Sequence, residues 1–125
     1  MDILQRTPAE DELGKWETQL RKGGLALAAL ATLWNGRLYG LEMLRRLDAE
    51  AGMSVSEGAI YPLLNRLKSE GLVAAEWVEA DAGHPRKYYS LTDLGRARVA
   101  DMARSWTSFA AGLERLLAPL KKDAR

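Results

Sequence analysis

Hydrophobic residues recur every three or four positions along four stretches of the chain, which is the spacing of amphipathic helices. We expect the first helix to begin at Ala9, because Pro8 and the acidic residues after it suit a helix start. Gly23-Gly24 interrupts its apolar stripe at about 1 kcal/mol per glycine relative to alanine, so we expect a bend or a close helix crossing there. The stripe consists of Leu13, Trp16, Leu20, Leu27, Ala31 and Trp34.

The next two stretches predict a pair of short helices. The first runs from Tyr39 to Ala51 and is closed by Gly52, with apolar positions at Leu41, Leu44, Leu47 and Ala51. The second begins at Ser54, which with Glu57 fits the S-x-x-E capping box, and it ends before Gly71, which fits the left-handed residue after a helix. Its apolar face contains Ile60, Leu63, Leu64 and Leu67. Two helices joined by so short a turn form a helix-turn-helix, although any three-helix bundle contains such pairs.

The opposite face of the 54–70 helix is small, aromatic and hydrogen-bonding, which suits a DNA groove better than a core. Pro62 removes one helical hydrogen bond, so we expect an irregular first turn. Tyr61 lies about a quarter-turn from the apolar face, so it is either a DNA contact or an exposed tyrosine without a role. This face carries Gly58, Tyr61, Pro62, Asn65 and Ser69, flanked by Arg66 and Lys68.

Two strand-forming segments follow, LVAAEWV and RKYYSL, separated by the turn residues Asp81 to Pro85. A hairpin directly after a helix, with Arg86 and Lys87 at its base, is the pattern of a wing. Winged helices place a helix in the major groove and lay the wing along the backbone or the minor groove. Two adjacent basic residues can equally be a solvated charge pair.

The last stretch predicts a long helix capped by Thr92 and ended by Pro119 near residue 117 or 118. Its apolar positions alternate gaps of three and four, the period of a coiled-coil seam. A seam of this length exceeds what one small domain can cover, so we expect a partner helix from a second copy. The seam contains Val99, Met102, Trp106, Phe109, Leu113, Leu116 and Leu120.

Composition narrows the class of protein. The 125 residues are 47% hydrophobic and 28% charged, which indicates one small globular domain. Because the net charge is only +1, any attraction to DNA must come from basic residues clustered on one part of the surface. The chain contains no Cys, which excludes disulfides and fits a reducing compartment. The N-terminus does not resemble a signal peptide, and the apolar run Gly24 to Trp34 is too short for a bilayer. We therefore expect a cytoplasmic protein that is not an enzyme and has no metal or cofactor.

The segments SEGAIYPLLNRLKSEGLV and GHPRKYYSLTDLG, with LYGLEMLRRL before them, resemble the PadR family of transcriptional regulators. The resemblance covers roughly residues 22–117, and His84 stands where the family usually has Arg. It implies a winged helix-turn-helix with a long C-terminal dimerisation helix, acting as a repressor that responds to small aromatic ligands. The alternative is a winged helix that binds a protein partner instead of DNA; steep salt dependence of binding would favour DNA.

These interpretations predict a division of the chain and three groups of site residues. The division is a flexible arm at 1–8, a DNA-binding domain at 9–91, a dimerisation helix at 92–118 and a loose tail at 119–125. The predicted contacts with double-stranded DNA are Tyr39, Ser54, Ser56, Glu57, Gly58, Tyr61, Asn65, Arg66, Lys68, His84, Pro85, Arg86, Lys87 and Tyr88. The predicted homodimer interface is Leu13, Trp16, Leu20, Val99, Met102, Trp106, Phe109, Leu113 and Leu116. A planar aromatic effector is expected at Trp16, Met102, Trp106 and Phe109, although Trp106 can equally be plain interface packing.

Overall fold

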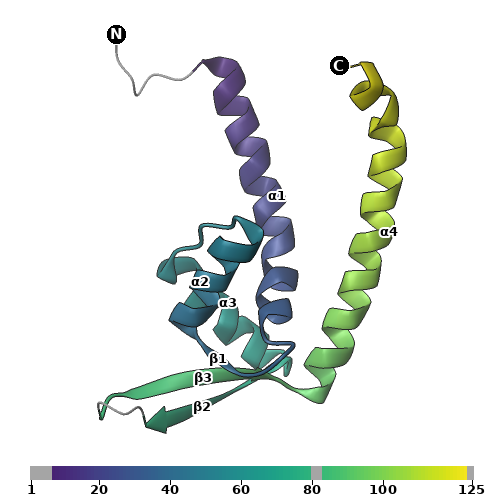
Figure 1. The fold of residues 1–125 in the computed structure, drawn as a ribbon. Coiled ribbons are helices and arrows are strands. Elements are labelled where there is room, and N and C mark those ends of the chain that lie inside the picture. Colours follow the sequence, from purple (N-terminus) through teal and green to yellow (C-terminus); the bar gives the residue numbers. More distant parts are fainter. Residues whose placement is uncertain (1–6, 80–82, 124–125) are drawn as a thin grey trace.

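The computed structural model describes residues 7–79 and 83–123 (Figure 1). The predicted class, a mainly helical winged helix-turn-helix with a long C-terminal helix, is confirmed. The elements in chain order are α1 (Pro8–Thr32), β1 (Leu38–Tyr39), α2 (Gly40–Ala51), α3 (Glu57–Ser69), β2 (Val73–Glu79), β3 (Pro85–Leu91) and α4 (Asp93–Asp123).

The helix α1 begins one residue earlier than predicted, because Thr7 caps it. The Thr7 Oγ1 accepts a hydrogen bond from the backbone N–H of Glu10 at 3.1 Å, and the Glu10 carboxylate accepts one from the N–H of Thr7 at 3.1 Å. This reciprocal box fixes Pro8 as the first helical residue, which contradicts the predicted flexible arm at that position. The helix is unbroken through Gly23 and Gly24, where an added Cβ would meet open space within the described chain, so no helix crosses closely there.

The core lies where α2 and α3 pack against the second half of α1 and against the inner ends of the strands (Figure 1). The predicted face of α3 is buried as expected. In α2 the predicted Leu47 is buried, but the prediction was wrong at Leu41, which is 42% exposed, and at Ala51, which is also exposed. The buried Met43 was not predicted. The core residues are Ala29, Leu30, Leu33, Met43, Leu47, Ile60, Leu63, Leu64, Leu67, Leu72, Val73, Tyr89 and Val99.

The wing belongs to a three-stranded antiparallel sheet in the order β1-β3-β2, where the sequence predicted only a two-stranded ribbon. The short β1 pairs Tyr39 with Tyr88, and β2 pairs with β3 from Val73↔Leu91 to Glu79↔Pro85. Arg86 and Lys87 oppose Val78 and Trp77, so they lie toward the tip of the wing and not at its base. Part of the predicted turn, residues 81 and 82, falls outside the described residues.

The start of α3 corrects the predicted capping box. The helix begins at Glu57 with Ser56 as its N-cap, so Ser54 lies in the preceding loop, too far back to cap it. The helix is continuous through Pro62, in place of the irregular first turn that we expected. At the other end Gly71 adopts φ 78°, as predicted, and the N–H of Leu72 donates to the carbonyl of Leu67 at 2.9 Å. This pattern is a Schellman termination.

The helix α4 is joined directly to the end of α3. The Thr92 hydroxyl accepts a hydrogen bond from the N–H of Gly95 at 2.9 Å and donates one to the carbonyl of Gly71 at 2.6 Å. The helix then continues through Pro119 to Asp123, so the predicted end near residue 117 or 118 was wrong. The loose tail predicted at 119–125 was wrong over residues 119–123, the part of it that the structure describes. Helix is tolerated there because only one turn follows the proline and the surface is exposed, so water can satisfy the freed carbonyl.

The first half of α1 and the second half of α4 both extend away from the sheet, beyond the core (Figure 1). Their apolar side chains are exposed in the single chain, and Trp16, Phe109 and Leu116 are 55%, 60% and 78% exposed. No helix within residues 7–79 and 83–123 is both long and apolar enough to span a bilayer.

Candidate nucleic-acid interface

A hollow of about 480 Å³ lies between the exposed face of α3, the start of α2 and the wing. It brings together Tyr61 and Asn65 of α3 with Arg86 and Lys87 of β3, which the sequence had predicted as separate contact groups. The two groups meet because β1 and β3 close the sheet beside the first turn of α2. Its lining residues are Tyr39, Gly40, Leu41, Glu57, Tyr61, Asn65, Trp77, Arg86, Lys87 and Tyr89.

The ring of Tyr61 is held in this hollow by the shape of α2. Gly40 is buried, and a Cβ on it would lie 2.7 Å from both Cε1 and Cζ of Tyr61. Real Cβ atoms do not approach other heavy atoms so closely, so the absence of a side chain at residue 40 lets the ring lie across the helix start. Tyr61 itself remains 37% exposed and faces solvent from α3.

Arg86 is packed in a stack of two guanidinium groups and two tyrosine rings. Its guanidinium lies 4.6 Å from the ring centroid of Tyr39, and that ring meets Tyr88 edge to face at 5.5 Å. On Tyr88 the guanidinium of Arg37 lies at 4.8 Å, and it also forms an ion pair with Glu76. Exposed cation–π contacts stabilise by about 0.5–1 kcal/mol, enough to favour one position of the Arg86 side chain while its N–H donors stay accessible.

Lys87 lies between two aromatic rings on the other side of β3. Its Nζ is 5.8 Å from the centroids of both Trp77 and Tyr89. Burial raises the pKa of Tyr89 and the neighbouring Tyr61 adds to the increase, so this phenol stays neutral well into alkaline solution. The hollow therefore has two cationic side chains against the single carboxylate of Glu57.

Sequence reasoning missed five residues at or beside the hollow, among them Gly40 and Tyr89, which line it. Trp77 is 67% exposed and Leu41 is 42% exposed, and both line the hollow, while Arg37 supports the aromatic stack beside it. Trp77 could have been found from the sequence. Side chains alternate between the two faces of a strand, and Trp77 lies opposite Lys87, so the two share a face of the hairpin. The position of Arg37 depends on β1, which the sequence did not predict.

Several predicted DNA contacts lie outside the hollow. Ser54 and Ser56 are exposed in the loop before α3, and Gly58 is exposed in its first turn. Arg66 forms an ion pair with Glu70 at 3.4 Å near the C-terminal end of α3, the same end as Lys68. The remaining three lie on the wing, where His84 and Pro85 are exposed near its tip and Tyr88 belongs to the aromatic stack.

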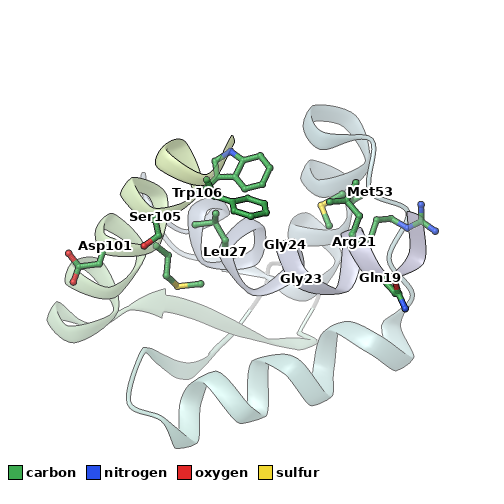
Figure 2. A pocket seen from close by; sticks show the side chains of 12 residues that line it. Gln19, Arg21, Gly23, Gly24, Leu27, Met53, Asp101, Ser105 and Trp106 are labelled. Carbon is green, nitrogen blue, oxygen red and sulfur yellow. The ribbon is translucent and has the colours of Figure 1, made fainter. Parts of the chain in front are cut away.

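A second, larger hollow of about 750 Å³ lies between α1 and α4 (Figure 2). Trp106 lies on one side and Met53, from the loop between α2 and α3, on the other. Three residues predicted for an effector, Met102, Trp106 and Phe109, line it, and the Trp106 and Phe109 rings are 6.4 Å apart. The lining residues are Gln19, Leu20, Arg21, Gly23, Gly24, Leu27, Met53, Asp101, Met102, Ser105, Trp106 and Phe109.

Two predictions do not fit this part of the structure, Trp16 as an effector contact and Val99 as part of the dimer interface. Within the described chain Trp16 does not line the hollow, and Leu20, one turn further along α1, takes its place. Val99 is 4% exposed and belongs to the core of the single chain, so it is not available to a second copy. The physical reason is the position of the first turns of α4, which pack on α1 and β3 before the helix leaves the domain.

No group of three His, Cys, Asp or Glu residues suited to a metal ion occurs in the part of the chain that the structure describes.

Comparison with known proteins places this geometry in a family. Residues 29–101 match the Transcriptional regulator PadR-like family. A PadR family transcriptional regulator from Eggerthella lenta has a crystal structure that superposes with a TM-score of 0.77, at 32% identity, over 87% of this chain and 95% of that one. A transcriptional regulator of Mycobacterium tuberculosis is 29% identical over 87 residues, which are 70% of this chain and 79% of that protein. An uncharacterized protein of Lysinibacillus sphaericus is 27% identical over 70 residues, 54% of this chain, and the match spans 64% of that protein's length.

Proposed function

The chain belongs to the PadR-like family of transcriptional regulators, and on this premise we propose that it is a homodimeric, ligand-responsive repressor. Family membership implies DNA binding, and family members are regulators, not enzymes. The proposed target is a pseudo-palindromic operator on the chromosome, so a cytoplasmic location is part of the same proposal.

The observation that carries the proposal is the shared hollow of α3 and the wing. With α3 in the major groove, Asn65 can pair with the edge of an adenine and Glu57 can accept from the amino group of a cytosine. Arg86 and Lys87 then lie against phosphates of the adjoining backbone, where the fork of Arg86 suits two phosphate oxygens. The aromatic stack supports this role because it orients Arg86 before DNA arrives.

The dimer is supported by the exposed apolar faces of α1 and α4. Extended apolar patches of this kind mark interaction surfaces in soluble proteins. A second copy of the chain fits because the surface lies on two long helices that extend past the core, so two copies can cover each other around a twofold axis. Two α3 helices would then read half-sites about one helical turn apart, ~34 Å. The residues exposed on this surface include Leu13, Trp16, Leu20, Trp106, Phe109, Leu113 and Leu116.

Effector binding is supported by the hollow between α1 and α4, whose volume falls within the range of small-molecule sites. The rings of Trp106 and Phe109 offer faces on which a planar aromatic ligand can stack. Met53 lines the same hollow from the loop that leads into α3, so a ligand there contacts the connection to the DNA-reading helix. A ligand that favours a dimer geometry with the wrong α3 spacing would release the operator and relieve repression.

Selection of duplex DNA from a random pool by the wild-type protein tests the proposal. We expect a recovered pseudo-palindrome whose binding weakens steeply with salt. Arg86→Ala and Lys87→Ala should each reduce the slope of log K against log salt by roughly 0.9 per lost phosphate contact. Lys122→Ala, on the far end of α4, is the matched control and should leave the slope unchanged. Failure to recover any sequence, or salt slopes equal in all four proteins, would contradict the proposal.

A further inference from the structure

Trp77 has a large side chain that is exposed to solvent on the proposed DNA-binding surface. It is 67% exposed, more than Trp16, Trp34 or Trp106, and it lines the hollow between α3 and the wing. We propose that Trp77 contacts the bound duplex directly, through an uncharged contact with deoxyribose or a thymine methyl group, and so contributes affinity that phosphate contacts do not supply. This inference rests on the proposed DNA binding and adds a residue to it.

Packing within the chain does not account for an indole at this position. The core uses β2 at Val73, which is buried, and at Ala75, which is partly buried against it. Trp77 lies two residues beyond Ala75, toward the wing tip. An indole that keeps two-thirds of its surface in water contributes little burial free energy to folding. A smaller strand-forming residue such as threonine would serve the strand equally well.

The register of the sheet decides which way Trp77 faces. It lies opposite Lys87, and directly paired residues of antiparallel strands share a face of the sheet. Two residues further along β3 on that same face is Tyr89, which is buried against the core. The indole therefore lies on the face of the wing that turns toward the helices, where it shares the hollow with Tyr61 and Asn65.

DNA is the occupant that this surface favours. Arg86 and Lys87 give the hollow a positive balance over Glu57, which suits a polyanion. A duplex strand that fills the hollow would cover the indole between the residues of α3 and the wing. Sugars and thymine methyl groups are the apolar parts of such a strand, and aromatic and apolar side chains recognise them without charge.

The salt dependence of binding distinguishes an uncharged contact from the phosphate contacts beside it. Neutralising a phosphate releases counterions, so loss of Lys87 lowers the salt dependence of binding. Loss of an apolar contact lowers affinity equally at every salt concentration. The two effects can be measured on the same duplex.

The experiment uses full-length protein and a duplex selected by the wild type from a random pool, titrated at several salt concentrations. The variants are Trp77→Ala, Trp77→Thr, which keeps strand propensity, and Lys87→Ala. Trp34→Thr is the matched control, because it removes another part-exposed indole, 46% exposed, outside the hollow. Circular dichroism and urea unfolding verify that the wing remains folded in each variant.

We expect both Trp77 variants to bind about tenfold more weakly, with a salt slope equal to that of the wild type. Affinity within twofold of the wild type for Trp77→Thr would overturn the inference. So would a slope reduced as in Lys87→Ala, since Trp77 would then act only by orienting the lysine. If the wild type selects no duplex at all, the proposed function itself fails, whereas equal binding by wild type and Trp77 variants removes this inference alone.

Uracil substitution in the selected duplex then identifies the group that the indole touches. If the partner is a thymine methyl, the deficit of Trp77→Thr shrinks on the uracil duplex. If the partner is deoxyribose, the deficit persists unchanged.

Discussion

The phenol ring of Tyr61 on α3 lies against Gly40 at the start of α2, where a Cβ would come within 2.7 Å of two ring carbons. Gly40 does not have a positive φ, so space for the ring, and not backbone conformation, requires glycine here. The two helices of the helix-turn-helix are thus fitted to each other at the residue that we expect to read DNA.

Gly40→Ala should therefore displace Tyr61 from the hollow. We expect a loss of unfolding free energy of about 1–3 kcal/mol, typical of overpacking, together with weaker and less selective DNA binding. Urea unfolding and duplex titration measure the two effects. In a Tyr61→Ala background the same substitution should be nearly neutral, because the obstructing ring is gone. An equal loss of stability in both backgrounds would show that Tyr61 is not the cause.

Gly95, in the first turn of α4, packs closely against the backbone of Leu72, which follows α3. A side chain at residue 95 would have equally little space. A Cβ there would lie 2.9 Å from the carbonyl carbon of Leu72 and closer still to its oxygen. Inside a helix, Gly→Ala otherwise increases stability by about 0.5–1 kcal/mol. We expect Gly95→Ala to destabilise the protein by more than that amount, because a backbone group cannot turn aside as a side chain can. A rise in the unfolding midpoint would contradict this packing.

The proposed dimer predicts a strong effect of charge on the exposed seam. Leu116 is 78% exposed in the single chain, so Leu116→Glu should be harmless to a monomer but should place a carboxylate in the apolar interface of a dimer. Sedimentation should show a dimer for the wild type and dissociation at micromolar concentration for the variant. Leu94→Glu, 52% exposed at the sheet end of α4, is the control and should remain dimeric. A wild-type monomer that is stable and folded would refute the dimer.

The proposed effector site predicts quenching that depends on one indole. Titration with planar aromatic compounds should quench tryptophan emission, because a ligand stacked on Trp106 alters its environment. The quenching should disappear in Trp106→Ala, while the other three tryptophans still report a folded protein. Quenching that persists in the variant would place the ligand elsewhere, and no quenching from a broad panel would favour plain packing of Trp106.

The buried phenol of Tyr89 predicts a loss of stability in alkaline solution. Burial raises its pKa in the folded protein, so above about pH 10 the unfolded chain releases this proton first. The contribution to stability is fully present below the unfolded pKa and is lost as the pH rises through the folded pKa. Urea unfolding between pH 8 and 11 should therefore show a steeper decline for the wild type than for Tyr89→Phe. Equal declines would mean that other groups dominate.

Local rules in the sequence determined much of the fold. Periodicity identified the buried face of α3, and Gly71 and Thr92 marked the end of α3 and the start of α4 where the structure has them. The alternating strands predicted the wing itself, with Arg86 and Lys87 on it. These features depend on residues within a few positions of each other, so they can be read directly from the chain.

Only the tertiary structure decided how the candidate site is assembled. The pairing of β1 with β3 joins residues about fifty positions apart, and it places Tyr39 and Arg37 in the stack that supports Arg86. The same packing brings Trp77 into the hollow with Tyr61 and buries Val99 in the domain. Such contacts depend on how separate elements pack, because an amphipathic pattern indicates that a face is covered without identifying what covers it.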